Sequence, residues 1–362
     1  MDKKNRPDYI LLGVVGILLV LGILVLANVS AVFSQDKFDK PTYYLFHQIL
    51  FGILPGIIAA FILYKISLAF IKKWSWLFVS VNLALMVLVF IPFIGIVSGG
   101  APRWINLWFF TFQPSEALKL SFLIYLSVWL TTRKTNKDWK FTFFPFLVIL
   151  GVVAFLLYLQ SDLSTLIVII SVAGIVYFLS ETPIWQMFTL IGLGTAFVWF
   201  LIKFVPYRMN RILVFLDPRK DPMGIGYQIK QALIAVGSGG ITGVGLGMSV
   251  QKYGRLPQTM SDSIFAIFAE ETGFIGSAIL IILYLLLLWR GFKIAKESKD
   301  KFFSLFAAGI SGWICIQAFI NVGAMIGVLP LTGIPLPFIG YGGSHIITEL
   351  AAVGLLLNIS KR

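Results

Sequence analysis

Long apolar segments are the feature of this sequence that most limits how the chain can fold. A helix of about 20 apolar residues is long enough to cross the hydrocarbon core of a bilayer. Segments of this length occur near residues 9–29, 45–64, 74–94, 115–132, 142–159, 163–180, 187–205, 264–289, 303–325 and 344–360. The sequence therefore predicts an all-α integral membrane protein with about ten transmembrane helices.

Charged residues are scarce along the whole chain. They make up 12% of the sequence, and hydrophobic residues make up 58%, whereas about a quarter of a soluble protein is charged. No segment alternates between apolar and polar residues as a transmembrane barrel strand does. The first apolar run is longer than the core of a signal peptide, so we expect an uncleaved first helix. Residues 1–362 thus form a single polytopic domain.

The distribution of basic residues predicts the topology. Ten spans place both termini on one side, and that side carries more than half of the 29 Lys and Arg residues, in the termini and in the connections near 65–73, 133–140 and 290–301. Short loops with excess Lys and Arg face the cytoplasm. Both termini are therefore expected in the cytoplasm, and the long loop at about 206–263, between helices 7 and 8, is expected outside.

This outer loop carries several basic residues. Arg208, Arg211 and Lys252 lie in it, and a long loop is free of the topology rule. Two interpretations stay open: a solvated loop that contacts lipid headgroups, or a site for an anionic ligand such as phosphate, which the guanidinium fork of arginine recognises. Because the chain lies in a membrane, its net charge of +13 does not indicate a nucleic-acid partner.

Two polar motifs lie at predicted outer helix ends. The sequence QPSE at 113–116 predicts a helix start, since proline suits the first turn and Glu116 favours the positive end of the helix dipole. Glu116 and Lys119 share a helix face, so they form either a structural ion pair or part of a site. Asp162, in LQSDLST, either caps the next helix or pairs with Lys119.

Two glycine-rich and proline-rich stretches predict irregular backbone. GSGGITGVGLG at 237–247 lacks the GxGxxG order of a dinucleotide site, and GVLPLTGIPLPFIGYGGSHIITE at 327–349 cannot form one continuous helix. At membrane depth such backbone is tolerated only against protein or a wet cavity. We therefore expect tight turns or re-entrant segments that face a cavity near the outer surface.

The sequence GRLPQTMSDSIFAIFAEETGFIG at 254–276 places three carboxylates where the eighth helix enters the membrane. Asp262 precedes the helix and could act as its cap. Glu270 and Glu271 lie about two turns further along. Because charge inside a membrane is costly, at least one of these two glutamates should face the protein interior.

These motifs together resemble the SEDS family of bacterial cell-wall proteins, and within it the FtsW branch more than RodA or SpoVE. The resemblance covers almost the full length and includes RWINL with QPSEALKL, LQSDLST, FLDPRKDPMGIGYQIKQALIAVGSGGITGVGLG and QKYGRLPQTMSDSIFAIFAEETGFIG. It implies a peptidoglycan glycosyltransferase in the bacterial cytoplasmic membrane. Such an enzyme polymerises lipid II, a disaccharide-pentapeptide on undecaprenyl diphosphate, into glycan strands at the outer membrane face.

The resemblance also implies roles for particular residues. Asp262 is expected as the catalytic acidic residue. Its ionised carboxylate would act as the general base that takes a proton from the acceptor hydroxyl. The expected substrate-binding residues are Arg103, Lys119, Arg208, Arg211, Lys252, Glu116, Asp162 and Glu271. A divalent cation, Mg²⁺ or Mn²⁺, could assist the basic residues at the diphosphate.

The expected partners are lipid II, nascent glycan, membrane lipids, a class B penicillin-binding transpeptidase and other proteins of the division or elongation machinery. Two other functions stay open. A lipid II flippase would use the intramembrane charges as a path for the headgroup, and a non-enzymatic scaffold would only recruit a synthase. Polymerisation of purified lipid II in detergent separates them.

Overall fold

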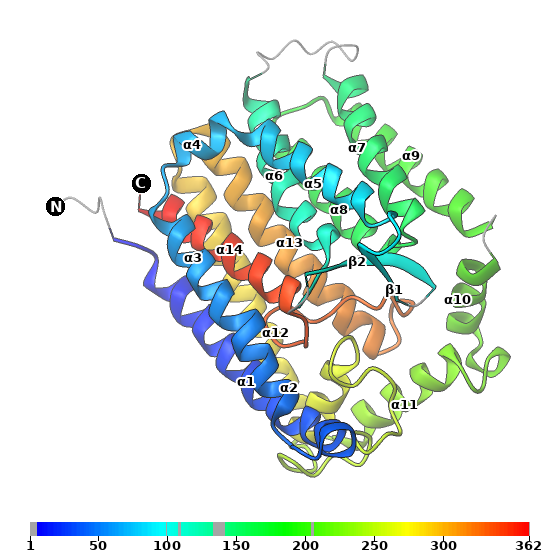
Figure 1. Ribbon diagram of the computed structural model, residues 1–362. Helices are drawn as coiled ribbons and strands as arrows, with labels where there is room; N and C mark the ends of the chain where they lie inside the picture. The colour runs from blue at the N-terminus through cyan, green and yellow to red at the C-terminus, as the bar shows by residue number, and fades with distance from the viewer. Residues whose placement is uncertain (1–5, 99, 108–109, 133–141, 204–205, 362) are drawn as a thin grey trace.

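The computed structural model describes residues 6–98, 100–107, 110–132, 142–203 and 206–361, and most of these residues are helical. The helices of the bundle are α1 (Tyr9–Phe38), α2 (Tyr43–Gln48), η1 (Ile49–Ile53), α3 (Leu54–Lys65), α4 (Leu68–Lys73), α5 (Ser75–Leu88), α6 (Pro114–Thr132), α7 (Phe143–Leu159), α8 (Leu163–Leu179), α9 (Ile184–Lys203), α12 (Ile264–Glu297), α13 (Lys301–Met325) and α14 (Gly343–Ser360). Figure 1 shows them packed side by side in one bundle.

All ten predicted spans are helical in the described part of the chain. Five helical segments are long and apolar enough to cross a membrane, and four of the other predicted spans are shorter apolar helices. The second span is continuous from Tyr43 to Lys65 but contains a π-helical stretch, η1, in its middle. The prediction of an all-α membrane protein is therefore confirmed.

The two C-terminal helices form the centre of the bundle. In α14, 83% of the spanning window is buried, compared with 17% in the window of Tyr43–Lys65. Helix α14 packs against α3, and α13 packs against α12, α8 and α6; in Figure 1 α14 lies in the foreground between α3 and α13. The peripheral helices leave their apolar side chains exposed, as expected for surfaces that face lipid.

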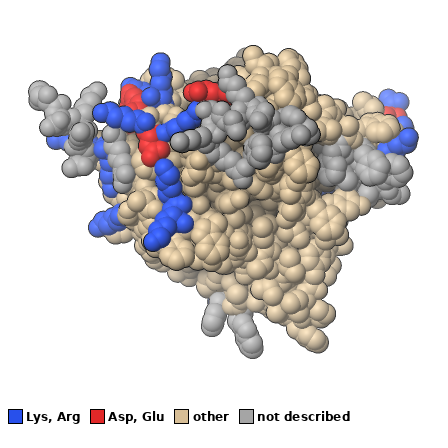
Figure 2. Space-filling model, turned by 90° about the horizontal axis from the view of Figure 1, so that it is seen from above, with Lys and Arg blue, Asp and Glu red and all other residues tan. Residues whose placement is uncertain are grey.

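Ion pairs join the connections that we predicted on the cytoplasmic side. Lys72 lies 3.4 Å from Asp300, Lys301 lies 3.3 Å from Glu181, and Arg290 lies 2.5 Å from Asp8. Both chain ends lie on this side of the molecule (Figure 1). Figure 2, seen from above, shows Lys and Arg gathered with a few acidic residues over one part of this face. The arrangement agrees with the predicted topology.

A small antiparallel sheet, which the sequence did not predict, follows α5. It has the order β1 (Gly95–Ser98), β2 (Ala101–Asn106) and β3 (Thr111–Phe112), with Ile105 opposite Phe112. The strands are too short to give a clear alternating pattern. The sheet leads directly into α6, so it lies over the outer ends of the helices.

The outer loop contains helices of its own. These are α10 (Pro206–Leu216), η2 (Pro218–Lys220) and α11 (Ile225–Ser238). They are too short to span a membrane, so the lengths of the apolar segments did not predict them. Residues 239–263 then form consecutive turns, in which Gly243, Gly245 and Gly247 have positive φ angles. The prediction of tightly turning backbone here is confirmed.

Helix α12 is interrupted at Gly273, whose φ of 66° and ψ of −161° are not helical. The glycine-rich loop replaces the missing hydrogen bonds: Val244 N donates to Glu270 O at 3.0 Å, and Phe274 N donates to Gly240 O at 2.9 Å. These hydrogen bonds join the glycine-rich loop to the unwound turn of α12. Residues 327–342 are also irregular. The irregular backbone predicted for 327–349 therefore ends at Gly343, where α14 begins.

Candidate active site

Asp262 lies in the last turn before α12, and its side chain does not cap that helix. The N-cap residue is Ser263, which makes no side-chain capping bond. The carboxylate oxygen Oδ1 of Asp262 instead accepts a hydrogen bond of 2.8 Å from Ser261 Oγ. The alternative role of a helix cap therefore has no support in the geometry.

The surroundings of Asp262 favour a proton acceptor. Burial raises the pKa of its carboxyl above the ordinary value, against the opposing effects of Ser261, Gln228 and the positive charge of Arg211. The carboxylate is still partly exposed. A base works best when its pKa is raised toward the working pH, so burial improves Asp262 for this role.

The basic residues predicted to bind substrate differ in where they lie relative to Asp262. Arg211, on α10, acts on Asp262 electrostatically and donates through Nη1 to Leu331 O at 3.1 Å. Arg103, on β2, donates to Gln160 O and Ser161 O at 3.0 and 2.8 Å. The side chain of Arg208 lies outside the described residues. Of the described basic side chains that we predicted, Arg211 is the one that acts on Asp262.

Lys252 is turned into the protein. It is 3% exposed, lies 3.3 Å from Glu271 Oε1, and donates to Asn28 Oδ1 and Gly247 O at 2.6 Å each. These contacts tie the outer loop to α1 and α12. In this conformation Lys252 stabilises the loop, and its ammonium group is not presented to a substrate.

Glu270 and Glu271 are both buried, at 3% and 5% exposure, so the expectation that at least one faces the interior is confirmed. Glu270 accepts from Ser249 Oγ and, at 3.2 Å, from Val250 N. Glu271 accepts from Asn28 Nδ2 at 2.5 Å. The two carboxylates at the membrane entry therefore hold the loop that carries Asp262.

Glu116 and Lys119 form a buried ion pair of 2.7 Å. Lys119 Nζ also donates to Gln317 Oε1 at 2.9 Å, and His345 Nδ1 lies 3.1 Å from Glu116 Oε2. On the other side of the imidazole, Nε2 lies 3.1 Å from Glu349 Oε1, although the angle is not that of a hydrogen bond. The structural ion pair considered at the sequence level is confirmed, inside a larger buried network.

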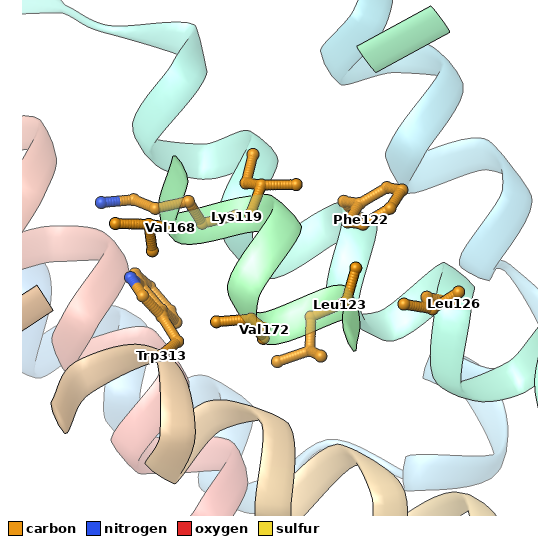
Figure 3. A pocket seen from close by; sticks show the side chains of 9 residues that line it. Lys119, Phe122, Leu123, Leu126, Val168, Val172 and Trp313 are labelled. Atoms are coloured by element: carbon orange, nitrogen blue, oxygen red, sulfur yellow. The ribbon is translucent and has the colours of Figure 1, made fainter. Parts of the chain in front are cut away.

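A cavity beside Lys119 is too small for a substrate. It has a volume of about 10 Å³ between α6, α8 and α13, and a water molecule needs roughly 10–15 Å³. Figure 3 shows Lys119 and Trp313 at one end of this cavity and Phe122 and Leu126 at the other. In this structure Lys119 therefore packs against neighbouring helices.

Asp162 caps α8, as one of the two sequence interpretations proposed. Its carboxylate accepts from Thr165 N at 3.1 Å and from Thr165 Oγ1 at 2.9 Å. It also accepts from Ser115 Oγ at 2.9 Å, which joins the start of α6 to the start of α8. The other interpretation, a pair of Asp162 with Lys119, is not seen, since Lys119 forms its ion pair with Glu116.

Three polar residues on the central helices contact the outer segments. Glu349 was one of the intramembrane charges of the flippase alternative, whereas Gln317 and Asn321 were not predicted. Asn321 donates to the carbonyl oxygen of Asp262. Gln317 donates through Nε2 to Pro335 O at 3.2 Å, and Glu349 accepts from Phe338 N at 2.8 Å. A polar residue inside an apolar span was the available signal. These three side chains position the Asp262 turn and the irregular 327–342 segment.

Among the residues that the structure describes, no group of three or more His, Cys, Asp or Glu side chains gathers in a way that could hold an ion. The described residues around Asp262 therefore do not by themselves supply a set of metal ligands, and Arg211 contributes positive charge there.

Fold and site together define a polytopic helical membrane protein with one partly exposed carboxylate, next to an arginine, at the outer end of the bundle. The model of the FtsW/RodA/SpoVE family of cell cycle proteins matches residues 9–362. The chain therefore belongs to this family, and it is a multi-pass protein of the bacterial cytoplasmic membrane.

Similar proteins support this assignment over the full length. Stage V sporulation protein E of Bacillus subtilis is 39% identical over 361 residues, covering 99% of this chain and 98% of the relative. A probable peptidoglycan glycosyltransferase FtsW of Thioalkalivibrio sulfidiphilus is 38% identical over 349 residues, covering 95% and 87%. Because the SpoVE and FtsW relatives match equally well, the similarity defines the family and not the branch.

Solved structures share the fold. A chain of a peptidoglycan synthase complex that coordinates polymerisation and crosslinking superimposes with a TM-score of 0.79 at 29% identity, covering 98% of this chain and 97% of that chain. The rod shape determining protein RodA of Thermus thermophilus superimposes with a TM-score of 0.73 at 27% identity, covering 98% and 96%.

Proposed function

We propose that this protein is a peptidoglycan glycosyltransferase that polymerises lipid II at the outer membrane face, in the division-type role that the FtsW resemblance implies. The observation that carries the proposal is the Asp262 carboxylate. It is partly exposed, its pKa is raised by burial, and it lies under the influence of Arg211. Relatives named as probable peptidoglycan glycosyltransferases match nearly the whole chain.

The reaction needs one base and one cation. In the proposed step, the ionised Asp262 carboxylate takes the proton of the acceptor sugar hydroxyl as its oxygen bonds to the anomeric carbon of the donor. The bond from that carbon to the diphosphate breaks, and the diphosphate leaves with the electron pair. In this proposal, Arg211 stabilises the developing negative charge. A single displacement inverts the anomeric centre, so no covalent enzyme intermediate is required.

The partner and cation expectations belong to the same proposal. A neighbour in fold comes from a peptidoglycan synthase complex, which supports a penicillin-binding transpeptidase as partner of this chain. A divalent cation would enter with the diphosphate of the substrate, since Mg²⁺ often combines one or two carboxylates with substrate phosphates.

The geometry favours an enzyme over a flippase. A flippase path needs charged groups along a channel, and the buried Glu116 and Lys119 are paired with each other. The cavity beside them has a volume of about 10 Å³, which cannot admit a sugar headgroup. A scaffold without chemistry would not need a partly exposed carboxylate beside an arginine.

The Asp262→Asn variant tests the proposal. Asparagine has nearly the same shape but cannot accept a proton, so polymerisation of purified lipid II in detergent should fall by at least about 100-fold. Asp217→Asn is the matched control in the same outer loop, and it should retain activity because Asp217 accepts a local bond from Arg219 N, which asparagine can also accept. Glycan synthesis by Asp262→Asn at the wild-type rate would remove the assignment.

A further inference from the structure

A second cavity lies directly beside the Asp262 turn on the outer side. Its volume is about 440 Å³, which is within the range of roughly 300–1,000 Å³ that is usual for ligand sites. We call it the outer aromatic pocket, because its wall contains six aromatic side chains: Phe33, His47, Phe51, Trp104, Phe110 and Tyr341. They come from the outer ends of α1 and α2, the small sheet and the segment before α14.

The wall of this pocket is fixed by hydrogen bonds. The Tyr341 hydroxyl lies 2.9 Å from His47 Nδ1, and Tyr341 N donates to Met260 O at 2.7 Å. Gly342 N donates to Gln48 Oε1 at 3.1 Å. Burial raises the pKa of Tyr341 to about 12, so its hydroxyl keeps its proton. A preformed wall loses little entropy when a ligand binds.

The pocket also has a polar edge. Thr111, Gln258, Thr259 and Ser261 contribute to its lining. Thr259 is 2% exposed, so its hydroxyl is enclosed by protein. The other hydroxyl and amide groups at this edge can bond to the hydroxyls of a ligand.

Ser261 connects the pocket to the proposed base. It lines the cavity, and its Oγ donates to Asp262 Oδ1 at 2.8 Å. A ligand group at this edge would therefore be one side chain away from the carboxylate. The pocket and Asp262 are parts of one outer-face arrangement.

The lining selects among the parts of a lipid-linked saccharide. Among the lining residues that the structure describes there is no Asp, Glu, Lys or Arg side chain, so they offer no charged partner for a diphosphate. Aromatic faces carry negative quadrupole charge and attract the weakly positive C–H groups of a pyranose ring, while hydroxyl and amide groups bond to its hydroxyls. A polyprenyl chain would leave the polar edge unsatisfied.

We propose that the outer aromatic pocket binds an N-acetylhexosamine ring of the glycan or of its lipid-linked precursor, beside Asp262. This inference rests on the proposed function, because it assigns the pocket to a saccharide substrate of the same site. Trp104 and Tyr341 supply ring faces, and Thr111 and Ser261 supply hydrogen bonds.

The experiment uses the full-length protein in detergent. The variants are Trp104→Leu, Tyr341→Leu and Thr111→Val, and the control is Trp76→Leu, an exposed tryptophan at the predicted cytoplasmic start of α5. The free disaccharide N-acetylglucosaminyl-N-acetylmuramic acid is the binding probe, followed by saturation-transfer NMR. Steady-state polymerisation of lipid II gives KM and kcat, and melting temperature reports folding.

We expect saturation transfer to the disaccharide with wild type and with Trp76→Leu, and its loss with Trp104→Leu. Removing one aromatic contact should raise KM for lipid II about three- to tenfold, with kcat nearly unchanged. If Trp104→Leu does not fold, Tyr341→Leu gives the same test because it also removes a ring face, and the nearly isosteric Thr111→Val should give a smaller rise in KM.

Three results would overturn the inference: no saturation transfer with wild type, an unchanged KM in all folded variants, or displacement of the disaccharide signal by undecaprenyl phosphate, which has no sugar. The proposed function fails separately. If wild type makes no glycan but Trp104→Leu still loses the disaccharide signal, the saccharide pocket stands and the polymerase assignment falls.

Discussion

Asn321 holds the backbone of Asp262 in place: its Nδ2 donates to the carbonyl oxygen of Asp262 at 2.7 Å. The same Nδ2 donates to Ile334 O at 2.7 Å, so one amide on the central helix α13 joins the turn before α12 to the 327–342 segment. Asn321 is 1% exposed. The candidate base is thus positioned by a residue inside the bundle.

The variant Asn321→Leu should lower activity more than it lowers stability. It leaves two carbonyl groups without this donor, which costs about 1–3 kcal/mol for a buried group, and it releases the Asp262 turn. We expect kcat for polymerisation to fall at least about tenfold in protein that remains folded. Asn82→Leu is the control, because Asn82 is also buried but lies on α5; equal activity in the two variants would refute the positioning role.

Activity should decline as the pH is lowered through the raised pKa of Asp262. The carboxyl must be ionised to accept a proton, and burial raises its pKa above the ordinary aspartate value of about 3.9. The acidic limb of kcat/KM against pH should therefore have its midpoint above that value. Ser261→Ala removes a bond that lowers this pKa and should move the midpoint upward; a midpoint at or below 3.9 would contradict the assignment.

The same pKa shift has a consequence for stability. A carboxyl whose pKa is raised by folding contributes stability below its unfolded pKa, and this contribution is lost as the pH rises through the folded value. Asp262→Asn removes the buried negative charge and should raise the melting temperature at pH 7. The difference from wild type should shrink below about pH 4. Thermal unfolding followed across this pH range measures the difference in melting temperature. An Asp262→Asn variant that melts lower than wild type at pH 7 would contradict a raised pKa of Asp262.

Breaking the Glu116–Lys119 pair should destabilise the protein. Lys119→Met leaves a buried carboxylate without its ammonium partner, a change that costs about 3–5 kcal/mol. Glu116→Gln combined with Lys119→Met removes both charges and should recover most of the loss. Lys72→Met is the exposed control, since its pair with Asp300 has side chains 37% and 41% exposed. Thermal unfolding of wild type and the three variants measures the effect. A melting temperature of Lys119→Met equal to that of wild type would show that the buried pair does not stabilise the protein.

Alanine variants at Gly243 and Gly254 distinguish the cost of close packing from the cost of the backbone conformation. Both have positive φ, at 83° and 79°, but a Cβ at Gly243 would lie 2.1 Å from Glu271 O, whereas nothing lies within 4 Å at Gly254. Alanine at Gly254 should cost about 1–2 kcal/mol for the left-handed conformation. Alanine at Gly243 should cost clearly more, because the contact with α12 must open. Equal melting temperatures of the two variants would show that the loop does not pack as described.

Local pattern predicted much of this molecule. The ten spans follow from apolar length, and the start of α6 follows from QPSE. The pair of Glu116 and Lys119 follows from a spacing of three residues on one helix. Each of these depends on neighbours in the chain or on transfer of a segment from water to lipid, which a sequence contains directly.

Contacts between distant segments were decided only by the tertiary structure. Lys252 was expected to bind phosphate, yet it is buried against Glu271 and Asn28, and the latter lies 224 residues away in the sequence. The bond from Asn321 to Asp262 spans 59 residues, and the outer aromatic pocket takes its lining from five separate parts of the chain. The sequence by itself determined which segments enter the membrane and which carboxylate precedes α12. Helix packing determined which side chains meet, because many pairings of apolar faces have nearly equal free energy until all the buried polar groups must be satisfied together.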